Sequence, residues 1–186
     1  KNIKEIEYDD ILADTYYFQK NEEFESFYNR IKEFKKNYFI NKIHNENNLN
    51  QFSDLEIITI GSLIEKEGLD YDDKKNISSV IFNRLKKNMK LQIDATVIYA
   101  LTNGDNDLNR KLYLSDLKIN HPFNTYIING LPPKPISYVG TKTIGILIEN
   151  YKTDFLFYFF NNSLKKHIFS KNYNEHKKKL NEYRNK

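Results

Sequence analysis

Cysteine and tryptophan are both absent from this chain of 186 residues. Without cysteine the protein has no disulfide scaffold, no thiol nucleophile and no zinc site built on sulfur. Glycine and proline are scarce, at six and four residues, and no glycine-rich loop that could cradle a phosphate is present. We also find no spacing typical of a metal site and no Ser/His/Asp arrangement, so we predict neither a metal nor a cofactor.

Long apolar runs are missing as well. None approaches the roughly 20 residues that a membrane helix needs, and the first residues lack the hydrophobic block of a signal peptide. We therefore expect the chain as it stands to be soluble. Because it starts with Lys1 instead of methionine, we expect it to be a segment of a longer protein.

The net charge is small, +4 from 29 basic and 25 acidic residues. A dedicated nucleic-acid-binding protein usually has a larger positive excess. The run from Lys177 to Lys179 raises nucleic-acid binding as an alternative. We interpret these lysines as the solvated face of a helix and predict no nucleic-acid partner. Affinity for single-stranded DNA that falls steeply with salt would contradict this interpretation.

Aromatic residues, in contrast, are abundant, with 14 tyrosines and 13 phenylalanines in a 15% aromatic share. Rings in this number supply surface for a core, and they can also line a groove that binds sugars, bases or peptides. Composition alone does not choose between these uses.

Hydrophobic periodicity predicts a mostly helical α+β domain with one small sheet. Ser53 is expected to cap the second helix, and Asn88 to supply the left-handed end of the third. Pro122, Pro132, Pro133 and Pro135 predict a loop over residues 120–135. The expected helices cover residues 21–44, 53–68, 72–88, 95–101 and 142–151.

The last part of the chain predicts a β-hairpin followed by a helix. Residues 155–160 are typical of a fully buried strand, and residues 166–169 of its partner. Ser170 is expected to cap the final helix. We interpret His176, on the apolar stripe of that helix, as a packing residue with satisfied hydrogen bonds. The stripe consists of Tyr173, His176, Leu180 and Tyr183.

A carboxylate stands where a core residue is expected in the second helix. The apolar stripe of Ile57, Ile60 and Ile64 continues after three residues onto Glu67. Glu65 lies about 200° away around the helix and belongs to another face. Of the two acids, only Glu67 is therefore expected to point inward.

An inward position would raise the pKa of Glu67. Burial disfavours the charged form, and the negative end of the helix dipole lies nearby if Gly68 ends the helix. A carboxylic acid that stays protonated near neutral pH is what a general acid requires. The alternative is a side chain that bends into water at a frayed helix end, or that pairs with a basic residue.

Cleavage of a glycosidic bond is one reaction that needs such an acid, and most hydrolases add a second carboxylate. Asp94 is the only other acid in a setting that indicates order. It directly precedes a helical segment, however, and we interpret it as the N-cap of that helix. The sequence therefore does not favour a hydrolase with two carboxylates.

Several ordered motifs resemble the YceG-like family of membrane-anchored lytic transglycosylases, called MltG. Such a set, in the family's order, is far more specific than any single motif. The resemblance runs from about Leu12 to the end of the chain. The matching residues are 12–16 (LADTY), 62–67 (SLIEKE), 80–85 (VIFNRL), 91–99 (LQIDATVIY), 121–126 (HPFNTY), 130–136 (GLPPKPI), 167–170 (HIFS) and 175–176 (EH).

The resemblance implies a lysozyme-like catalytic core that cuts the glycan strands of peptidoglycan internally, between N-acetylmuramic acid and N-acetylglucosamine, without consuming water. In such families one Glu first protonates the glycosidic oxygen. It then acts as the base while the muramic C6 hydroxyl closes a 1,6-anhydro ring. That Glu corresponds to Glu67, the residue that periodicity also selects.

Other motif positions carry over as candidate substrate-binding residues. Asn83 has a bracing role as an equal alternative, and His167 a structural one. Two roles are possible for the other four residues, Gln92, Thr96, Asn124 and Tyr126. Their side chains either form hydrogen bonds to sugar groups or form bonds that hold the cleft together. The full set is Asn83, Gln92, Thr96, Asn124, Tyr126 and His167.

The chain also departs from the family pattern. Ala13 stands where proline is usual, Lys134 interrupts the small residues of its motif, and Gly68 follows the catalytic Glu where threonine is common. The first two are expected to change loop stiffness. The third removes a hydroxyl near Glu67 and leaves the orientation of its carboxyl group open.

The resemblance further implies a domain plan and partners. We expect residues 1–20 to lead into a catalytic domain over residues 21–186, with the family's membrane anchor and LysM-like module lying outside this chain. The native location would be the outer face of the cytoplasmic membrane, with peptidoglycan synthases as partners. The alternative function is a glycan-binding module without catalysis, in which Glu67 is only a ligand or a structural group.

Overall fold

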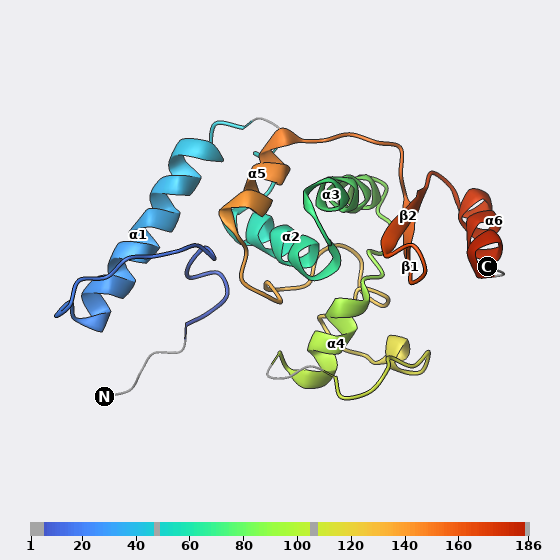
Figure 1. The fold of residues 1–186 in the computed structure, drawn as a ribbon, viewed down its shortest axis with the longest axis horizontal. Coiled ribbons are helices and arrows are strands. Elements are labelled where there is room, and N and C mark those ends of the chain that lie inside the picture. Colours follow the sequence, from blue (N-terminus) through green and yellow to red (C-terminus); the bar gives the residue numbers. More distant parts are fainter. Residues whose placement is uncertain (1–5, 47–48, 105–107, 185–186) are drawn as a thin grey trace.

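A computed structural model describes residues 6–46, 49–104 and 108–184; the first five residues of the expected lead-in segment therefore lie outside it. The expected α+β class is confirmed, with helices and a two-stranded antiparallel sheet (Figure 1). The elements are α1 (Phe24–Lys42), α2 (Asp54–Glu67), α3 (Tyr71–Lys86), α4 (Asp94–Thr102), the 3-10 helix η1 (Asp116–Lys118), α5 (Thr141–Glu149), β1 (Phe157–Asn161), β2 (Lys166–Ser170) and α6 (Tyr173–Arg184).

Helix α2 is the centre of the fold. Its start is fixed as expected, because Ser53 accepts a hydrogen bond from the Glu56 backbone N–H and the Glu56 side chain accepts one from Ser53 in return. Every residue from Ile57 to Ile64 is buried. Helices α3 and α5 pack against α2, and α4 crosses near its end (Figure 1). The helix that carries Glu67 is therefore held on several sides.

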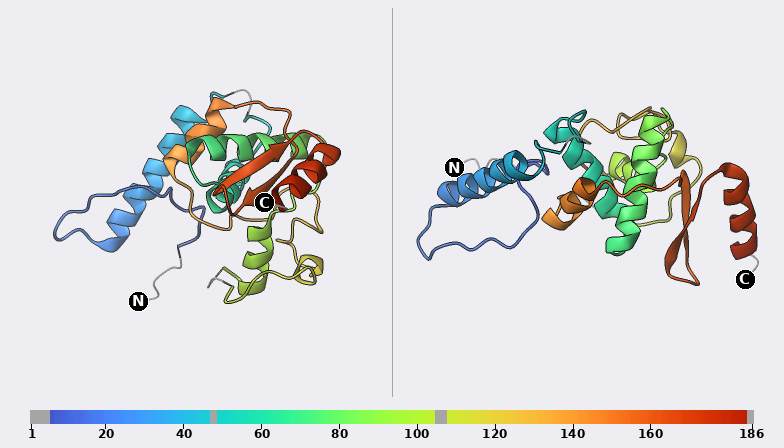
Figure 2. Two further views of the ribbon diagram at one scale, coloured as in Figure 1. Left: turned by 45° about the vertical axis from the view of Figure 1, so that its right-hand side comes forward. Right: turned by 90° about the horizontal axis from the view of Figure 1, so that it is seen from above.

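Helix α1 lies at one end of the molecule, away from the sheet (Figures 1 and 2). The residues that lead into it return to the core at Ala13, which forms a bridge with Gly140 before α5. Spacings of seven and three residues place Phe24, Ile31 and Phe34 on one face of this helix. Ile31 is buried, but Phe24 and Phe34 are exposed. Only part of this apolar face is therefore used in the core.

Left-handed residues end three of the helices. Asn88 has φ of 52° just after α3, as predicted, and Asn103 and Asn150 have φ of 55° and 49° after α4 and α5. Asparagine tolerates this conformation better than most residues. The prediction for Asp94 is wrong: Ile93 occupies the N-cap position of α4 and Asp94 is the first residue of the helix. The Asp94 carboxylate bonds elsewhere, as described below.

The hairpin pairs Phe157 with Ser170 and Asn161 with Lys166. The prediction of a fully buried first strand is wrong, because the residues of β1 are mostly half-buried and Phe160 is exposed. Ser170 also differs from its predicted role. It ends β2 with a buried side chain, and Asn172 caps α6 by accepting a hydrogen bond of 2.9 Å from the Glu175 backbone N–H.

Helix α6 packs on the hairpin at the end of the molecule opposite α1 (Figures 1 and 2). His176 lies against the rings of Phe157 and Phe159, with centroids 5.3 and 5.6 Å away. It is a packing residue, as predicted, but its Nδ1 has no hydrogen-bond partner in the described part of the chain. Among the described residues, no helix combines the length and apolar character needed to cross a membrane.

Candidate active site

Glu67 is the last residue of α2 and continues the buried stripe of that helix. Its carboxyl group is partly buried. The hydroxyl of Tyr158 in β1 donates a hydrogen bond of 3.1 Å to Oε2 of Glu67. The backbone N–H of Ala95, in the first turn of α4, also stabilises the ionised form of this carboxyl group. The Glu67 carboxyl group at the end of α2 therefore interacts with both the hairpin and the start of α4.

The pKa of Glu67 is raised above its ordinary value, in the direction that the sequence predicts. Burial is the main cause, and the negative charge of Asp94 adds to it. The hydroxyl of Tyr158, the charge of His167 and the Ala95 N–H act in the opposite sense because they stabilise the ionised form. Glu67 is therefore a carboxylic acid that keeps its proton to higher pH than an ordinary glutamate, and it has neighbours that stabilise its ionised form.

Asp94 provides a second carboxylate beside Glu67. Its Oδ1 accepts a hydrogen bond of 2.5 Å from the hydroxyl of Tyr126. The two residues are 32 positions apart, one at the start of α4 and the other in the loop after η1. Burial and the Asp94 carboxylate both raise the pKa of Tyr126, so its hydroxyl stays protonated and donates.

His167 approaches the site from β2. Its Nδ1 lies 2.8 Å from Oδ2 of Asp73 in α3, and both side chains are almost fully buried, with 7% and 10% exposed. The rings of Tyr158 and His167 are nearly perpendicular, with centroids 5.3 Å apart. Asp73 therefore orients the imidazole beside the tyrosine that bonds Glu67.

Tyr158 has its pKa raised well above the usual value, chiefly by burial and then by the neighbouring Glu67. Its hydroxyl therefore remains a donor. The guanidinium of Arg84 acts in the opposite direction on the pKa of both Tyr158 and Tyr126. Arg84 is only 6% exposed. It donates to the carbonyls of Leu156 and Leu91, at 2.7 and 2.6 Å.

Two of the predicted substrate-binding residues are fully enclosed. Thr96 bonds the hydroxyl of Thr125 at 2.9 Å, and Asn124 donates to the carbonyls of Leu117 and Ile119 at 3.1 and 2.8 Å. The exposed fraction is 0% for Thr96, Asn124 and Thr125. Of the two roles left open by the sequence, the geometry supports the one that holds the loop of Tyr126 against α4.

Gln92 is exposed and lies two residues before Asp94. Its backbone is left-handed, with φ of 50°, an uncommon conformation for glutamine. Its N–H donates to the carbonyl of Thr125 at 3.1 Å, which ties this bend to the same loop. The Gln92 side chain itself is exposed to solvent.

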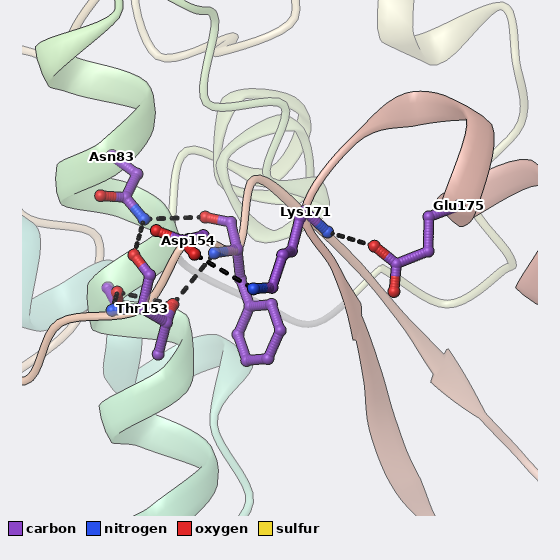
Figure 3. Close-up of polar contacts among 7 residues, drawn as sticks. Asn83, Thr153, Asp154, Lys171 and Glu175 are labelled. Carbon is purple, nitrogen blue, oxygen red and sulfur yellow. Dashed lines mark hydrogen bonds and ion pairs between the residues drawn. The ribbon is translucent and has the colours of Figure 1, made fainter.

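Asn83 serves as a brace between α3 and the segment that leads into β1 (Figure 3). Its amide donates to the carbonyls of Thr153 and Phe155, at 2.8 and 2.9 Å. Lys171, which directly follows β2 at the same open end of the hairpin, pairs with Asp154 at 3.1 Å (Figure 3). These bonds fix the direction in which the chain enters β1 and thereby the position of Tyr158.

Glu65 is not simply the outward acid that the sequence predicts. It forms an ion pair with Lys74 of α3, and its Oε1 accepts a hydrogen bond of 3.0 Å from the Gly140 N–H. Lys74 packs against Gly68, where an added Cβ would collide with the lysine Cγ. The missing side chain at Gly68 thus makes room for a lysine that ties the end of α2 to α3.

Sequence reasoning did not identify Tyr158, Asp73 or Arg84 as site residues. Tyr158 is the one hydroxyl in an otherwise apolar run, FLFYFF, and that exception was the available signal. Arg84 lies three residues after Ile81 and four after Val80, on the buried face of its helix, where an unpaired cation is unusual. Asp73 gave no signal, because an acid in the first turn of a helix is ordinary.

Comparisons with known proteins identify the family of this chain. Residues 10–182 match the YceG-like family. An endolytic murein transglycosylase of Bacillus subtilis is 38% identical over 147 residues, which cover 79% of this chain and 39% of the relative. A second one, from Streptococcus pneumoniae serotype 2, is 32% identical over 131 residues, which cover 70% of this chain and 24% of the relative.

A solved structure is also similar. The crystal structure of a yceG-like protein from Listeria monocytogenes superposes with a TM-score of 0.71 at 35% sequence identity. The match covers 91% of this chain and 54% of that one. The chain therefore spans well under half the length of the curated relatives and about half of the solved one.

Proposed function

The chain belongs to the YceG-like family, and from that premise we propose that it is the catalytic part of a lytic transglycosylase that cuts peptidoglycan glycan strands internally. The observation that carries this proposal is the state of Glu67. Its pKa is raised, and the Tyr158 hydroxyl and the Ala95 N–H both stabilise its ionised form. Such a group can both give a proton and take one back.

In the first step Glu67 acts as the general acid. The bond between C1 of the muramic acid residue and the bridging O4 breaks, and its electron pair moves to O4, which takes the Glu67 proton. The ionised Glu67 is then stabilised by the Tyr158 hydroxyl and the Ala95 N–H. Positive charge remains on the sugar at C1.

In the second step Glu67 acts as the base. The C6 hydroxyl oxygen of the same sugar attacks C1, and its proton passes to Glu67. The product carries a 1,6-anhydro ring, and the enzyme returns to its starting protonation state. No water, metal or cofactor enters this balance, because the substrate supplies the attacking oxygen.

The candidate substrate-binding residues divide into two groups in this proposal. Tyr126, which bonds Asp94, and the exposed Gln92 are the ones we propose to contact the glycan. His167 is almost fully buried and bonded to Asp73, so we propose that it supports Tyr158. Asn83, Thr96 and Asn124 are enclosed or bonded to backbone and support the loops around the site. The native enzyme would act outside the cytoplasmic membrane from a membrane anchor, alongside peptidoglycan synthases.

The test is digestion of purified peptidoglycan, with products identified by mass spectrometry. We expect products that end in 1,6-anhydro muramic acid, and none from Glu67→Gln. Glu33→Gln, on the exposed face of α1, is the matched control and should keep full activity. Reducing muramic ends would indicate a hydrolase. Glycan binding without any product would indicate a binding module instead.

A further inference from the structure

One carboxylate oxygen of Asp73 joins two segments that border the catalytic acid. The backbone N–H of Leu69 donates to Oδ2 of Asp73 at 3.0 Å, and Nδ1 of His167 lies 2.8 Å from the same oxygen. Leu69 is two residues after Glu67, and His167 belongs to β2, which packs against α3 (Figure 1). A single oxygen therefore holds both the chain that leaves α2 and the second strand of the hairpin.

These contacts close a circuit around Glu67. One route runs from Asp73 to His167, then to the nearly perpendicular ring of Tyr158, and the Tyr158 hydroxyl donates to Glu67 at 3.1 Å. The other route runs from Asp73 to Leu69 and back along the chain to Glu67. The acid and the tyrosine that bonds it are thus connected to the same side chain through different elements.

We propose that Asp73 is a positioning residue for Glu67: it fixes the end of α2 relative to the hairpin, so that the Tyr158 hydroxyl meets the Glu67 carboxyl group. This proposal deepens the proposed function and rests on it for the reaction. Asp73 acts through Leu69 and His167 and forms no bond to the sugar. Without it, the two segments would move more independently, and the hydrogen bond from Tyr158 would form for a smaller fraction of the time.

A role limited to the start of α3 is the competing explanation. Acids in the first turn of a helix stabilise it by interacting with the helix dipole, and both Asp72 and Asp73 lie in that turn. Asp72 is exposed, but the Asp73 side chain is only 10% exposed and has a histidine partner 94 positions away. A dipole effect requires neither feature. Asp72→Ala is therefore the matched control.

The experiment has to separate the hydrogen bonds of Asp73 from its charge, because several charged or titratable groups surround Glu67. They come from β1, β2, the start of α4, the loop after η1 and α3, and are Tyr158, His167, Asp94, Tyr126 and Arg84. Asp73→Asn and Asp73→Ala remove the same charge, but only asparagine keeps a side-chain oxygen that can accept from Leu69. A difference between these two variants therefore does not come from the charge.

The first measurement is a titration of the Glu67 carboxyl carbon by NMR, with Glu67→Gln used to assign the signal. Weakening the bond from Tyr158 raises the pKa of Glu67, so the curve of Asp73→Ala should lie about half a pH unit above that of Asp73→Asn. The difference should disappear when both variants also carry Tyr158→Phe. Asp72→Ala should titrate like the parent protein. If Asp73→Ala does not fold, Asp73→Ser takes its place, since its hydroxyl is one bond shorter.

Equal curves for the alanine and asparagine variants overturn the proposal, as does a difference that persists with Tyr158→Phe. Digestion of soluble glycan strands gives the second measurement. Relative to Asp73→Asn, Asp73→Ala should lower kcat about tenfold and leave KM unchanged. A lower melting temperature alone, with equal titrations and equal kcat, means a structural role and also overturns it. The titration needs no turnover, so it decides the role of Asp73 even if no variant releases products and the proposed function fails.

Discussion

Tyr158 and Glu67 are 91 residues apart in the sequence, and the hydroxyl of the first donates a 3.1 Å hydrogen bond to Oε2 of the second. The bond joins the hairpin to the end of α2. It stabilises the form of Glu67 that exists only after the proton has left. Tyr158 and Asp94 therefore act on the same carboxyl group in opposite directions.

Tyr158→Phe should move the alkaline limb of the pH–rate profile to higher pH. The hydroxyl stabilises ionised Glu67, so its removal raises the Glu67 pKa further. Hydrogen bonds to charged groups contribute about 1.5 kcal/mol or more, and we expect the maximal rate to fall about tenfold. The measurement is release of anhydro products across a pH series. Tyr173→Phe, on an exposed ring of α6, should behave like the parent protein, and an unshifted limb in Tyr158→Phe would contradict the role given to this hydroxyl.

Glu67→Gln should stabilise the fold at neutral and alkaline pH. The folded-state pKa of Glu67 is raised above its unfolded value of about 4.5, so the folded protein binds this proton more tightly. The parent protein therefore loses stability as the pH rises from that value through the folded pKa. We expect the variant to melt about 2–4 °C higher at pH 8, which is roughly 1 kcal/mol for this size of domain.

The same comparison at pH 4 provides the check on that prediction. Below the unfolded-state pKa both states hold the proton, and the two melting temperatures should converge. Glu33→Gln should show no such pH-dependent gap. A constant difference between Glu67→Gln and the parent at both pH values would show that protonation is not its cause.

Gly68→Ala should destabilise the protein by about 1–2 kcal/mol, measured by urea unfolding. A Cβ at this position would collide with Cγ of Lys74 and lie 3.3 Å from its Cα. Lys74 would have to leave its ion pair with Glu65. If this explanation is right, Gly68→Ala should cost much less in a Lys74→Ala background. Equal costs in both backgrounds would mean that the collision is unimportant.

Gln92→Gly should separate stability from activity. Glycine adopts a φ of 50° without the strain that glutamine bears there, so the free energy of unfolding should stay the same or rise by up to about 1 kcal/mol. Product release should fall about tenfold because the amide side chain is gone. Gln92→Asn, which tolerates the same backbone, is the companion variant. Full activity in the glycine variant would exclude a substrate contact by this side chain.

Local rules were sufficient for much of the fold. The capping box at Ser53 and the spacing of Ile57, Ile60 and Ile64 depend on neighbours within a few positions, and these predictions agree with the structure. The inward direction of Glu67 follows from the same spacing. Asn88 ends its helix as expected, because an asparagine in this conformation is also a local preference.

Contacts between distant segments decided the rest. Asp94 has the sequence signature of a cap, but Tyr126, 32 residues later, takes its carboxylate. Ser170 has the sequence signature of an N-cap, but it pairs with Phe157 as the last residue of β2. His167 meets Asp73 across 94 positions of sequence. No periodicity within one element contains this information, since it arises only when the hairpin packs beside α3.

The buried guanidinium of Arg84 also has a consequence for a chain that is still being synthesised. Its hydrogen bond to Leu91 joins groups only seven residues apart, but its bond to Leu156 waits for residues 72 positions further on. Glu67 leaves the ribosome long before Tyr158 and His167. A nascent chain thus contains Glu67 before it contains the groups that stabilise its ionised form. Under the proposed function, the protein becomes able to cut the cell wall only when the hairpin of β1 and β2 has been made and folded.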